Sequence, residues 1–305
     1  PNRGTAWLYT RERLDRFFNA ASRSAADPRS PAGQTALRRM AGDSFSIAAE
    51  LGRVTGELHL ALASAGDEEP DFLPESTTAG DVEEWVQGAE QYLDQLVSGI
   101  RHQLELIPSA LPAGTRQALT ALVRDPSDIR RQLRGMLVLA ADNSWKMRVH
   151  GDYHLSQLLR ASSPEEAGGV WVVLDFEGEP ARPLAERRRK QSPLRDVASM
   201  LRSFDYVTRM AIREYNTDDF MVREALHRWG ELWLGAAREA FLESYLEALG
   251  GAPLVPGDRD RFHHALSAFE LEKAIRELGY EMNSRPDWMW VPLRGIQTIR
   301  ERSGA

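Results

Sequence analysis

Residues 150–180 constrain this chain more than any other stretch, because they place two acidic sites at the ends of short elements. The stretch reads His-Gly-Asp-Tyr-His-Leu-Ser-Gln, then an apolar pair and a turn, then Val-Trp-Val-Val-Leu and Asp-Phe-Glu-Gly-Glu-Pro. Gly168 and Gly169 suit a tight reversal, because glycine adopts positive φ at little cost. The pattern predicts a strand, a loop, a short strand, a turn, a buried strand and an acidic loop. Asp152 and Asp175 would then face one another across a hairpin-like unit.

This arrangement of carboxylates suits phosphoryl transfer. That chemistry needs one carboxylate to orient and deprotonate the attacking hydroxyl, and oxygen ligands to hold Mg²⁺ on the nucleotide phosphates. Asp152 is placed for the first task and Asp175, directly after an apolar run, for the second. Gln157, five residues after Asp152, can offer a neutral amide oxygen to the metal.

The same residues resemble a known family. The motif His-Gly-Asp-x-His-x-x-Gln at 150–157, followed by Asp-Phe-Glu at 175–177, resembles the aminoglycoside-phosphotransferase-like kinases. The longer run at 175–206, with the segments at 71–75 and 280–292, resembles the maltokinase branch, including the kinase domain often fused behind trehalose synthase. The resemblance implies ATP-dependent phosphorylation of maltose at its anomeric hydroxyl, giving maltose 1-phosphate on a route from trehalose to glycogen. ATP and Mg²⁺ would be the cofactors, and trehalose synthase would be a partner in cis or in trans.

The resemblance also implies roles for individual residues. Asp152 would be the catalytic base, Gln157 and Asp175 would hold the metal, and Glu177 would be an outer metal ligand or a substrate contact. Three residues would order the loops near the site: His150, His154 and Arg195. Five residues of the C-terminal segment would line a sugar cleft: Tyr280, Glu281, Asn283, Arg285 and Trp288. Just before that segment the chain departs from the family, with Arg276 in place of a usual tyrosine and Gly279 in a normally bulkier position.

The expected fold is α+β and mainly α, namely a protein-kinase-like C-lobe with a small β unit. No glycine-rich phosphate loop and no strand-rich block with a phosphate-contacting lysine is visible, so we expect the N-lobe to be absent from this chain. Residues 1–9 would be an extended hinge after that lobe, and residues 10–305 the C-lobe. On this expectation the 305 residues alone turn over ATP poorly or not at all.

Helical periodicity and capping residues predict the remaining elements. Helices are expected from Thr10 to residue 20, over 41–63, from Asp81 to about residue 106, over 115–124 and 126–141, from Ser192-Pro193 onward, over 219–249 and 258–278, and from Pro292. Residues 21–35 are rich in Ser, Ala and Pro and are expected to form a loop. The helix over 41–63 would turn five residues toward the core: Ile47, Leu51, Val54, Leu58 and Leu62.

Other interpretations of the motif stay open. His150 and His154 also fit a metal-hydrolase cluster, although no second histidine pair with ligand spacing accompanies them. Glu177 and Glu179 also fit a glycosidase pair. A different small-molecule kinase of the same fold, acting on another sugar, an aminoglycoside or choline, and a non-catalytic lobe of a trehalose synthase fusion are further alternatives.

Composition excludes some classes of protein. The net charge of −7 argues against non-specific nucleic-acid binding, and the basic run at 187–190 is expected to be a solvated loop. The absence of cysteine excludes disulfides and thiolate zinc sites, which fits a cytoplasmic protein. No apolar run approaches the roughly 18 residues that span a membrane, so no membrane partner is expected.

Overall fold

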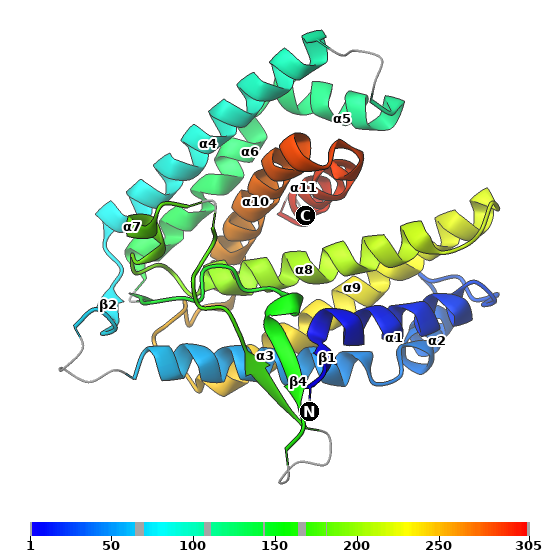
Figure 1. The fold of residues 1–305 in the computed structure, drawn as a ribbon, viewed down its shortest axis with the longest axis horizontal. Helices are drawn as coiled ribbons and strands as arrows, with labels where there is room; N and C mark the ends of the chain where they lie inside the picture. The colour runs from blue at the N-terminus through cyan, green and yellow to red at the C-terminus, as the bar shows by residue number, and fades with distance from the viewer. Residues whose placement is uncertain are drawn as a thin grey trace. The chain divides into compact units, whose positions relative to one another are not determined.

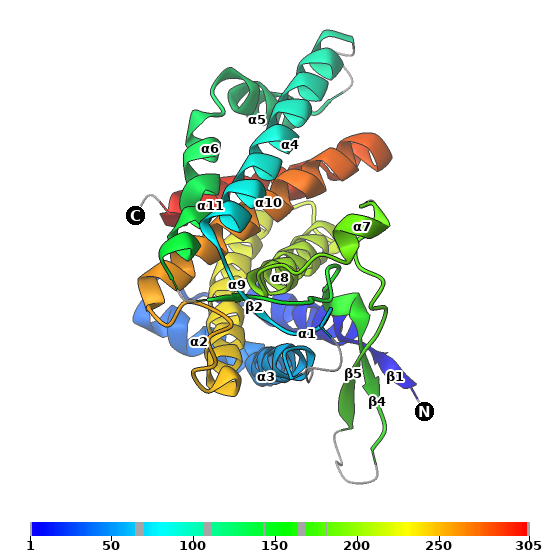
Figure 2. The same ribbon diagram turned by 90° about the vertical axis from the view of Figure 1, so that its left-hand side faces the viewer.

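The computed structural model describes residues 2–64, 70–106, 111–142, 144–163, 169–180 and 182–303. The chain divides into two compact units, whose elements are labelled in Figures 1 and 2. Unit 1 comprises residues 1–72, 150–189 and 203–252, and unit 2 comprises residues 73–149, 190–202 and 253–305. Each unit is therefore assembled from three separate stretches of sequence. Across the described residues, no helix is both long enough and apolar enough to span a bilayer.

Unit 1 is a helical layer with a three-stranded antiparallel sheet. Its elements are β1 (Asn2–Thr5), α1 (Ala6–Ala21), α2 (Pro31–Ala41), α3 (Ser44–Leu62), η2 (Leu155–Gln157), β4 (Leu158–Ala161), β5 (Val170–Val173), α7 (Leu184–Arg187), the greater part of α8 (Leu194–Glu214), and α9 (Phe220–Leu249).

The first helix begins four residues earlier than its sequence pattern predicts. Thr5, rather than Thr10, is the N-cap, and its hydroxyl accepts a hydrogen bond from the Leu8 amide at 3.4 Å. Residues 6–9 are therefore helical, and only residues 2–5 of the expected extended segment form a strand. Leu14, Phe17 and Phe18 are fully buried, as the periodicity predicts.

Helix α2 lies partly within the segment that composition predicts to be a loop. Ser30 caps it by accepting a hydrogen bond from the Gly33 amide at 3.0 Å, and Pro31 occupies the first helical position. Serine followed by proline is a strong start signal, because proline fixes a helical φ where no intrahelical N–H bond is needed. The loop prediction was therefore wrong from residue 31 onward.

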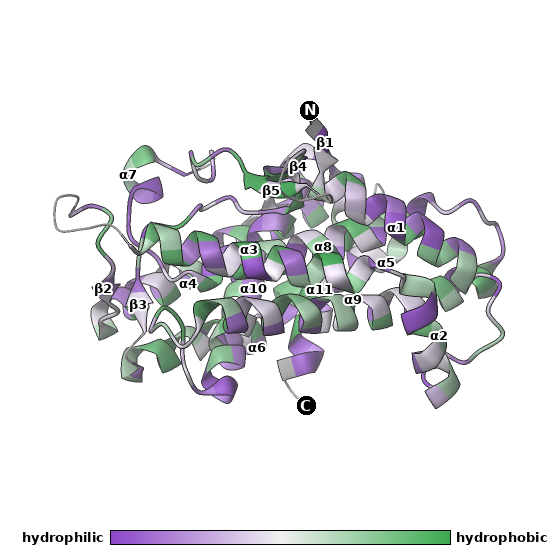
Figure 3. Cartoon of the chain, turned by 90° about the horizontal axis from the view of Figure 1, so that it is seen from below, coloured by the Kyte–Doolittle hydropathy of each residue, from purple (hydrophilic) through white to green (hydrophobic). Residues whose placement is uncertain are grey.

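The closest helix pair in unit 1 is α3 against α9. A Cβ added at Gly52 would lie 2.1 Å from the Phe241 carbonyl oxygen, and one at Gly56 would lie 2.7 Å from Ala248 Cβ. The α3 face that is buried carries Gly52, Thr55, Gly56 and His59 beside Leu51. Val54, Leu58 and Leu62 are only half-buried, so the predicted apolar face is partly wrong. Figure 3 shows hydrophilic and hydrophobic residues alternating along α3.

The sheet of unit 1 has the order β1-β4-β5, and both contacts are antiparallel. Strands β4 and β5 form the expected hairpin, with Arg160 opposite Trp171. Gly169 has φ +82°, as a reversal requires, whereas Gly168 lies outside the described residues. Strand β5 is an edge strand, coloured hydrophobic in Figure 3, with Trp171 buried and Val172 40% exposed. The prediction of a buried strand was therefore wrong.

Unit 2 is mainly helical. Its elements are β2 (Glu75–Ser76), α4 (Ala79–Leu106), α5 (Ala113–Arg124), α6 (Ser127–Leu133), η1 (Arg134–Ala141), β3 (Trp145–Lys146), the first turns of α8, α10 (Arg259–Ser284), η3 (Pro286–Trp288) and α11 (Trp290–Ser303). Helix α10 ends six residues later than its periodicity predicts, because its buried face continues through Gly279 and Glu281.

An ionic cluster joins the short β2–β3 sheet to the start of α4. Lys146 Nζ lies 2.6 Å from Asp81 Oδ1 and 3.3 Å from Glu75 Oε2. Thr78 and Asp81 form the capping box of α4, since each side chain accepts a hydrogen bond from the other residue's amide. Burial opposes ionisation of Asp81, but its bonds from Lys146 and Thr78 outweigh this and hold the pKa of Asp81 below its usual value. Burial likewise opposes the charge of Lys146, but Asp81 and Glu75 raise the pKa of Lys146 overall.

Candidate active site

Gln157 and Asp175 meet at the open end of the β4–β5 hairpin in unit 1. The Gln157 side-chain amide donates a hydrogen bond to Asp175 Oδ2 at 3.0 Å. The backbone continues the ladder one step beyond the strands, because the Leu174 amide donates to the Gln157 carbonyl at 2.9 Å. Strand pairing therefore sets the separation of these two side chains, although they are 18 residues apart.

Asp175 adopts an unusual backbone conformation. Its φ is +61°, and among the described residues it is the one non-glycine residue with positive φ. Aspartate tolerates the left-handed region better than most residues, yet the conformation still costs about 1 kcal/mol or more. Such strain concentrates at functional sites, because the surrounding structure must enforce it. Here it turns the chain out of β5 so that the Asp175 carboxylate reaches Gln157.

His150 joins the loop that precedes β4 to the loop that follows β5. Its Nε2 lies 2.7 Å from the Leu174 carbonyl oxygen, and its Nδ1 lies 3.3 Å from the Asp152 amide nitrogen. A carbonyl can only accept, so Nε2 carries the proton and Nδ1 accepts the Asp152 N–H. Both ring nitrogens of the buried His150 are thus engaged in holding the loop. That geometry leaves no ring nitrogen of His150 for the zinc alternative.

Two glycines let the same loops approach each other. Gly151 and Gly178 have φ +83° and +75°. A Cβ added at Gly151 would lie 3.3 Å from Gly178 Cα, which is tighter than an ordinary contact. Any other residue at 151 would push the Asp152 loop away from the acidic loop and would strain the backbone.

Asp152 lies in the loop held by these contacts. Its Oδ2 is 3.8 Å from His154 Nε2, and its side chain is 23% exposed. His154 Nδ1 accepts the Ser156 amide at 3.3 Å, so the neutral ring carries its proton on Nε2, toward the carboxylate. The Asp152 carboxylate is therefore partly exposed and faces the Nε2–H group of His154.

The oxygen donors at the hairpin end fit Mg²⁺. An octahedral ion with ligands at 2.0–2.1 Å places neighbouring ligand atoms about 2.9 Å apart. The Gln157 Nε2 to Asp175 Oδ2 separation is 3.0 Å. Rotation of the Gln157 amide by half a turn would present its oxygen at that spacing. Among the described residues, no group of three or more His, Cys, Asp or Glu side chains could hold a metal ion.

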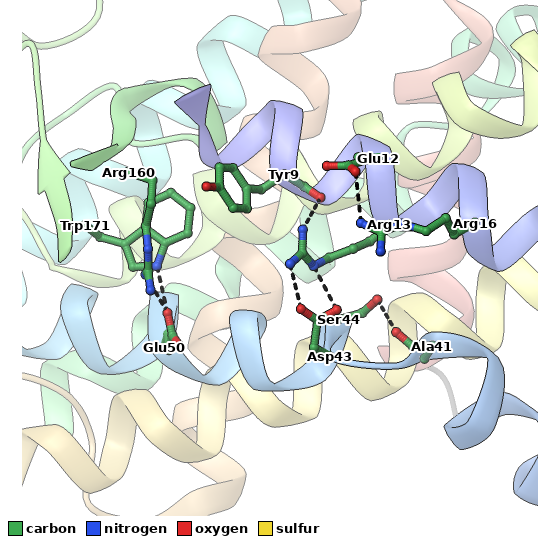
Figure 4. Close-up of polar contacts among 10 residues, drawn as sticks. All are labelled: Tyr9, Glu12, Arg13, Arg16, Ala41, Asp43, Ser44, Glu50, Arg160 and Trp171. Carbon is green, nitrogen blue, oxygen red and sulfur yellow. Dashed lines mark hydrogen bonds and ion pairs between the residues drawn. The ribbon is translucent and has the colours of Figure 1, made fainter. Parts of the chain in front are cut away.

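The hairpin is attached to α3 by one carboxylate, shown in Figure 4. Glu50 Oε2 accepts a hydrogen bond from Arg160 Nη1 at 2.7 Å and another from Trp171 Nε1 at 3.0 Å. Arg160 also stacks over the Trp171 ring, with its guanidinium carbon 4.8 Å from the centroid. Arg160 and Trp171 are direct cross-strand partners, so Glu50 binds both strands at the same position of the ladder.

The acidic loop itself carries Glu177 and Glu179. Glu177 is exposed, and its carbonyl accepts a hydrogen bond from Arg187 Nη1 at 3.2 Å. Glu179 forms an ion pair with Arg182 at 2.9 Å. A glycosidase needs two carboxyl groups that are free to act on the substrate. The ion pair of Glu179 with Arg182 therefore argues against Glu177 and Glu179 as a glycosidase pair.

The remaining predicted site residues belong to unit 2. Arg195 donates to Gln191 Oε1 at 3.0 Å and to the buried Glu272 at 2.7 Å, so it links α8 to α10. Arg285 makes two bonds to the buried Glu281, at 2.9 and 2.6 Å. The Arg285 guanidinium lies 5.7 Å from the ring centroids of both Tyr280 and Trp288.

The last turn of α10 brings most of the predicted sugar-binding set together. The Asn283 side-chain amide donates a hydrogen bond to the Gly279 carbonyl at 2.8 Å, so its nitrogen binds the backbone of α10. The Tyr280 ring is 59% exposed. Tyr280 thus offers an aromatic face beside a guanidinium, whereas the Glu281 carboxylate is occupied by Arg285.

Both residues that depart from the maltokinase resemblance, Arg276 and Gly279, lie against Tyr92 on α4. A Cβ at Gly279 would lie 2.2 Å from the Tyr92 hydroxyl, so glycine leaves room for it. The Arg276 guanidinium stacks 4.6 Å from the Tyr92 centroid and also bonds Glu272 at 3.1 Å. A tyrosine from α4 therefore occupies space that bulkier α10 residues would fill.

Comparisons with known proteins relate this chain to sugar kinases. No family model matches it. The sequence is 28% identical over 246 residues to a glucosamine kinase from Streptacidiphilus jiangxiensis, covering 80% of this chain and 47% of that protein. It is 30% identical over 250 residues to a glucosamine kinase from Mycolicibacterium smegmatis, covering 79% of this chain and 50% of that protein. The chain thus spans about half the length of these relatives.

Solved structures show the same relationship in three dimensions. A crystal form of glucosamine kinase matches 98% of this chain and 59% of its own, with a TM-score of 0.69 and 24% identity. Glucosamine kinase in complex with glucosamine, ADP and inorganic phosphate matches 97% of this chain and 57% of its own, with a TM-score of 0.67. The relatives named here are glucosamine kinases rather than maltokinases. The chain therefore has the kinase-like fold of the matched part of glucosamine kinase, in a mostly helical form with a small antiparallel sheet.

Proposed function

We propose that this chain carries the acceptor-activating and metal-binding groups of an ATP-dependent sugar phosphotransferase. The observation that carries the proposal is the hairpin end, where Gln157 and Asp175 lie 3.0 Å apart and His150 ties the Asp152 loop to the same end. Both sequence relatives bear the name of a sugar kinase, and a neighbouring structure holds a sugar and ADP.

In this proposal Asp152 orients an acceptor hydroxyl and takes its proton. The acceptor oxygen forms a bond to the γ-phosphorus, the bond from that phosphorus to the bridging oxygen of ADP breaks, and the proton on Asp152 passes to solvent. Asp175 and Gln157 would hold Mg²⁺, which supplies charge neutralisation on the phosphates when bound. Glu177, exposed next to Asp175, would take an outer contact to the metal or the substrate.

For the acceptor we propose glucosamine ahead of maltose. The sequence resemblance implies maltose, but both relatives and the structural neighbours are glucosamine kinases. The exposed Tyr280 ring, with Arg285 and Trp288 near it, would supply stacking and hydrogen bonding to a sugar of either kind. Glu281 and Asn283 would hold that surface in place through Arg285 and the helix end.

An acceptor panel tests this function. ADP release would be measured for the natural full-length protein with ATP, Mg²⁺ and each of glucosamine, glucose, maltose, choline and an aminoglycoside. The proposal predicts turnover with glucosamine that exceeds turnover with maltose at least tenfold. Turnover with maltose alone would restore the maltokinase interpretation, and turnover with choline or the aminoglycoside alone would contradict a sugar acceptor.

A further inference from the structure

Tyr153 follows Asp152 directly but points the other way. Its side chain has no exposed surface, whereas those of Asp152 and His154 are 23% and 36% exposed. The loop thus presents two polar groups outward and sinks one aromatic residue into unit 1. A buried tyrosine brings its hydroxyl into an apolar interior, where that hydroxyl requires a hydrogen-bond partner.

The partner of the Tyr153 hydroxyl is Thr55 on α3. The two oxygens are 3.0 Å apart, and Thr55 is also fully buried. The Thr55 hydroxyl donates to the Leu51 carbonyl at 2.7 Å, so its one proton is already used. Tyr153 is therefore the donor, and the bond has a fixed direction from the loop to the helix.

Thr55 lies where α3 approaches α9 closely. Gly52 and Gly56 flank it, and their missing side chains bring the backbone of α9 into direct contact. On the other side, the Tyr153 ring is 5.3 Å from the ring of His150, which bonds the Leu174 carbonyl at the hairpin end. The hydroxyl therefore links the loop that carries Asp152 to the closest-packed helix pair of the unit.

From this geometry we infer that the Tyr153 hydroxyl is a positioning group, which fixes the Asp152 loop on α3 through Thr55. The inference rests on the proposed function, since Asp152 is the group being positioned. A shift of about 1 Å in a reacting group can cost on the order of 100-fold in rate. Loss of one neutral hydrogen bond should loosen the loop rather than displace it fully, so we expect about a tenfold fall in kcat.

The chain supplies a matched control in Tyr245. This tyrosine is likewise fully buried and bonds α3, because its hydroxyl lies 3.0 Å from His59 Nδ1, one helical turn beyond Thr55. Tyr245 belongs to α9 and not to the loop. Tyr245→Phe therefore removes the same chemical group from the same helix without touching the residues around Asp152.

The test measures amide hydrogen exchange in the loop of the whole chain, for Tyr153→Phe, Thr55→Val, the double variant and Tyr245→Phe. We expect the amides of residues 152–156 to exchange at least tenfold faster in both single variants, no faster again in the double variant, and at the native rate in Tyr245→Phe. The inference would be overturned if these amides exchanged at the native rate in Tyr153→Phe, or if Tyr245→Phe accelerated their exchange as much as Tyr153→Phe does.

A kinetic measurement on the full-length protein separates this inference from the proposed function. With the preferred acceptor, Tyr153→Phe should lower kcat about tenfold while the KM for ATP stays unchanged, and Tyr245→Phe should leave kcat unchanged. An unchanged kcat in Tyr153→Phe contradicts positioning. Absence of turnover by the native protein with every acceptor defeats the proposed function, while the exchange result still decides whether the hydroxyl anchors the loop.

Discussion

The packing of α3 on α9 predicts that replacing glycine by alanine will lower the stability of the protein at one position and raise it at another. Gly52 on α3 is buried, and a Cβ there would lie 2.1 Å from the Phe241 carbonyl oxygen and 2.9 Å from its carbon. Gly235 on α9 is exposed, and a Cβ there would meet nothing within 4 Å. Both lie inside helices of unit 1, so Gly→Ala brings the same gain in helix propensity, about 1 kcal/mol.

The magnitude for Gly52→Ala follows from the separation that the methyl group needs. An ordinary van der Waals contact begins near 3.4 Å, whereas the added Cβ would lie only 2.1 Å from the Phe241 carbonyl oxygen. The backbones of α3 and α9 must therefore move apart by more than 1 Å. A gap of 0.5–1 Å already removes about a quarter to a half of each van der Waals contact. Overpacking of a tight core costs about 1–3 kcal/mol and occasionally more. Because the clash at Gly52 is severe, we take the upper end of this cost, and after the propensity gain we expect a net loss of roughly 2 kcal/mol for Gly52→Ala and a gain of about 1 kcal/mol for Gly235→Ala.

Urea denaturation followed by far-UV circular dichroism measures both effects. The midpoint of Gly52→Ala should fall and that of Gly235→Ala should rise, with similar m-values, because neither change alters the surface exposed on unfolding. A Gly52→Ala protein at least as stable as the native one would refute the packing argument, since the helices would then separate at no cost.

Two further predictions concern polar contacts. Glu50→Gln should speed amide exchange in both strands of the β4–β5 hairpin, because one Glu50 oxygen accepts hydrogen bonds from a guanidinium and an indole on the two strands. The control Asp43→Asn, which loses only an ion pair to α1 (Figure 4), should leave exchange in the hairpin unchanged. Equal acceleration in the two variants would contradict the attachment of the hairpin through Glu50. Lys146→Met should destabilise unit 2 by about 2 kcal/mol at pH 7. Burial opposes ionisation of Asp81, but its bonds from Lys146 and Thr78 lower its pKa, so this stabilisation is present above the ordinary value of 3.8 and is lost as pH falls through the folded-state value. The difference in stability between Lys146→Met and the native protein should therefore shrink below about pH 4, and a difference that persists at pH 2 would be the contrary result.

The elements that sequence predicted well are those with local signals. Helices α9 and α10 begin where they were expected, because Asp219 and Asp258 cap them and a cap is a contact between residues two or three apart. The hairpin with Asp152 before it and Asp175 after it is likewise a local feature. Helix α2 had an equally local signal in Ser30, and the composition of the segment outweighed it.

The contacts that sequence analysis missed are those between distant residues. Thr55 lies 98 positions from Tyr153, and Glu50 lies 121 positions from Trp171. No periodicity in a single sequence reports such partners. The one available signal was that α3 carries polar Thr55 between two glycines, where an outward-facing residue was expected. A small polar residue within a glycine pair indicates close helix packing, and that packing also explains why Val54 and Leu58 are only half-buried.

The proposed phosphoryl transfer depends most on the division of roles between Asp152 and Asp175. The most direct measurement is nucleotide binding to the full-length protein by calorimetry, with and without Mg²⁺, combined with phosphoryl transfer to the preferred acceptor. Asp175→Asn should abolish the Mg²⁺-dependent part of nucleotide binding. Asp152→Asn should keep that binding but reduce transfer at least 100-fold, which is within the usual range for loss of a general base. Transfer within tenfold of native in Asp152→Asn, or Mg²⁺-dependent binding unchanged in Asp175→Asn, would contradict the account.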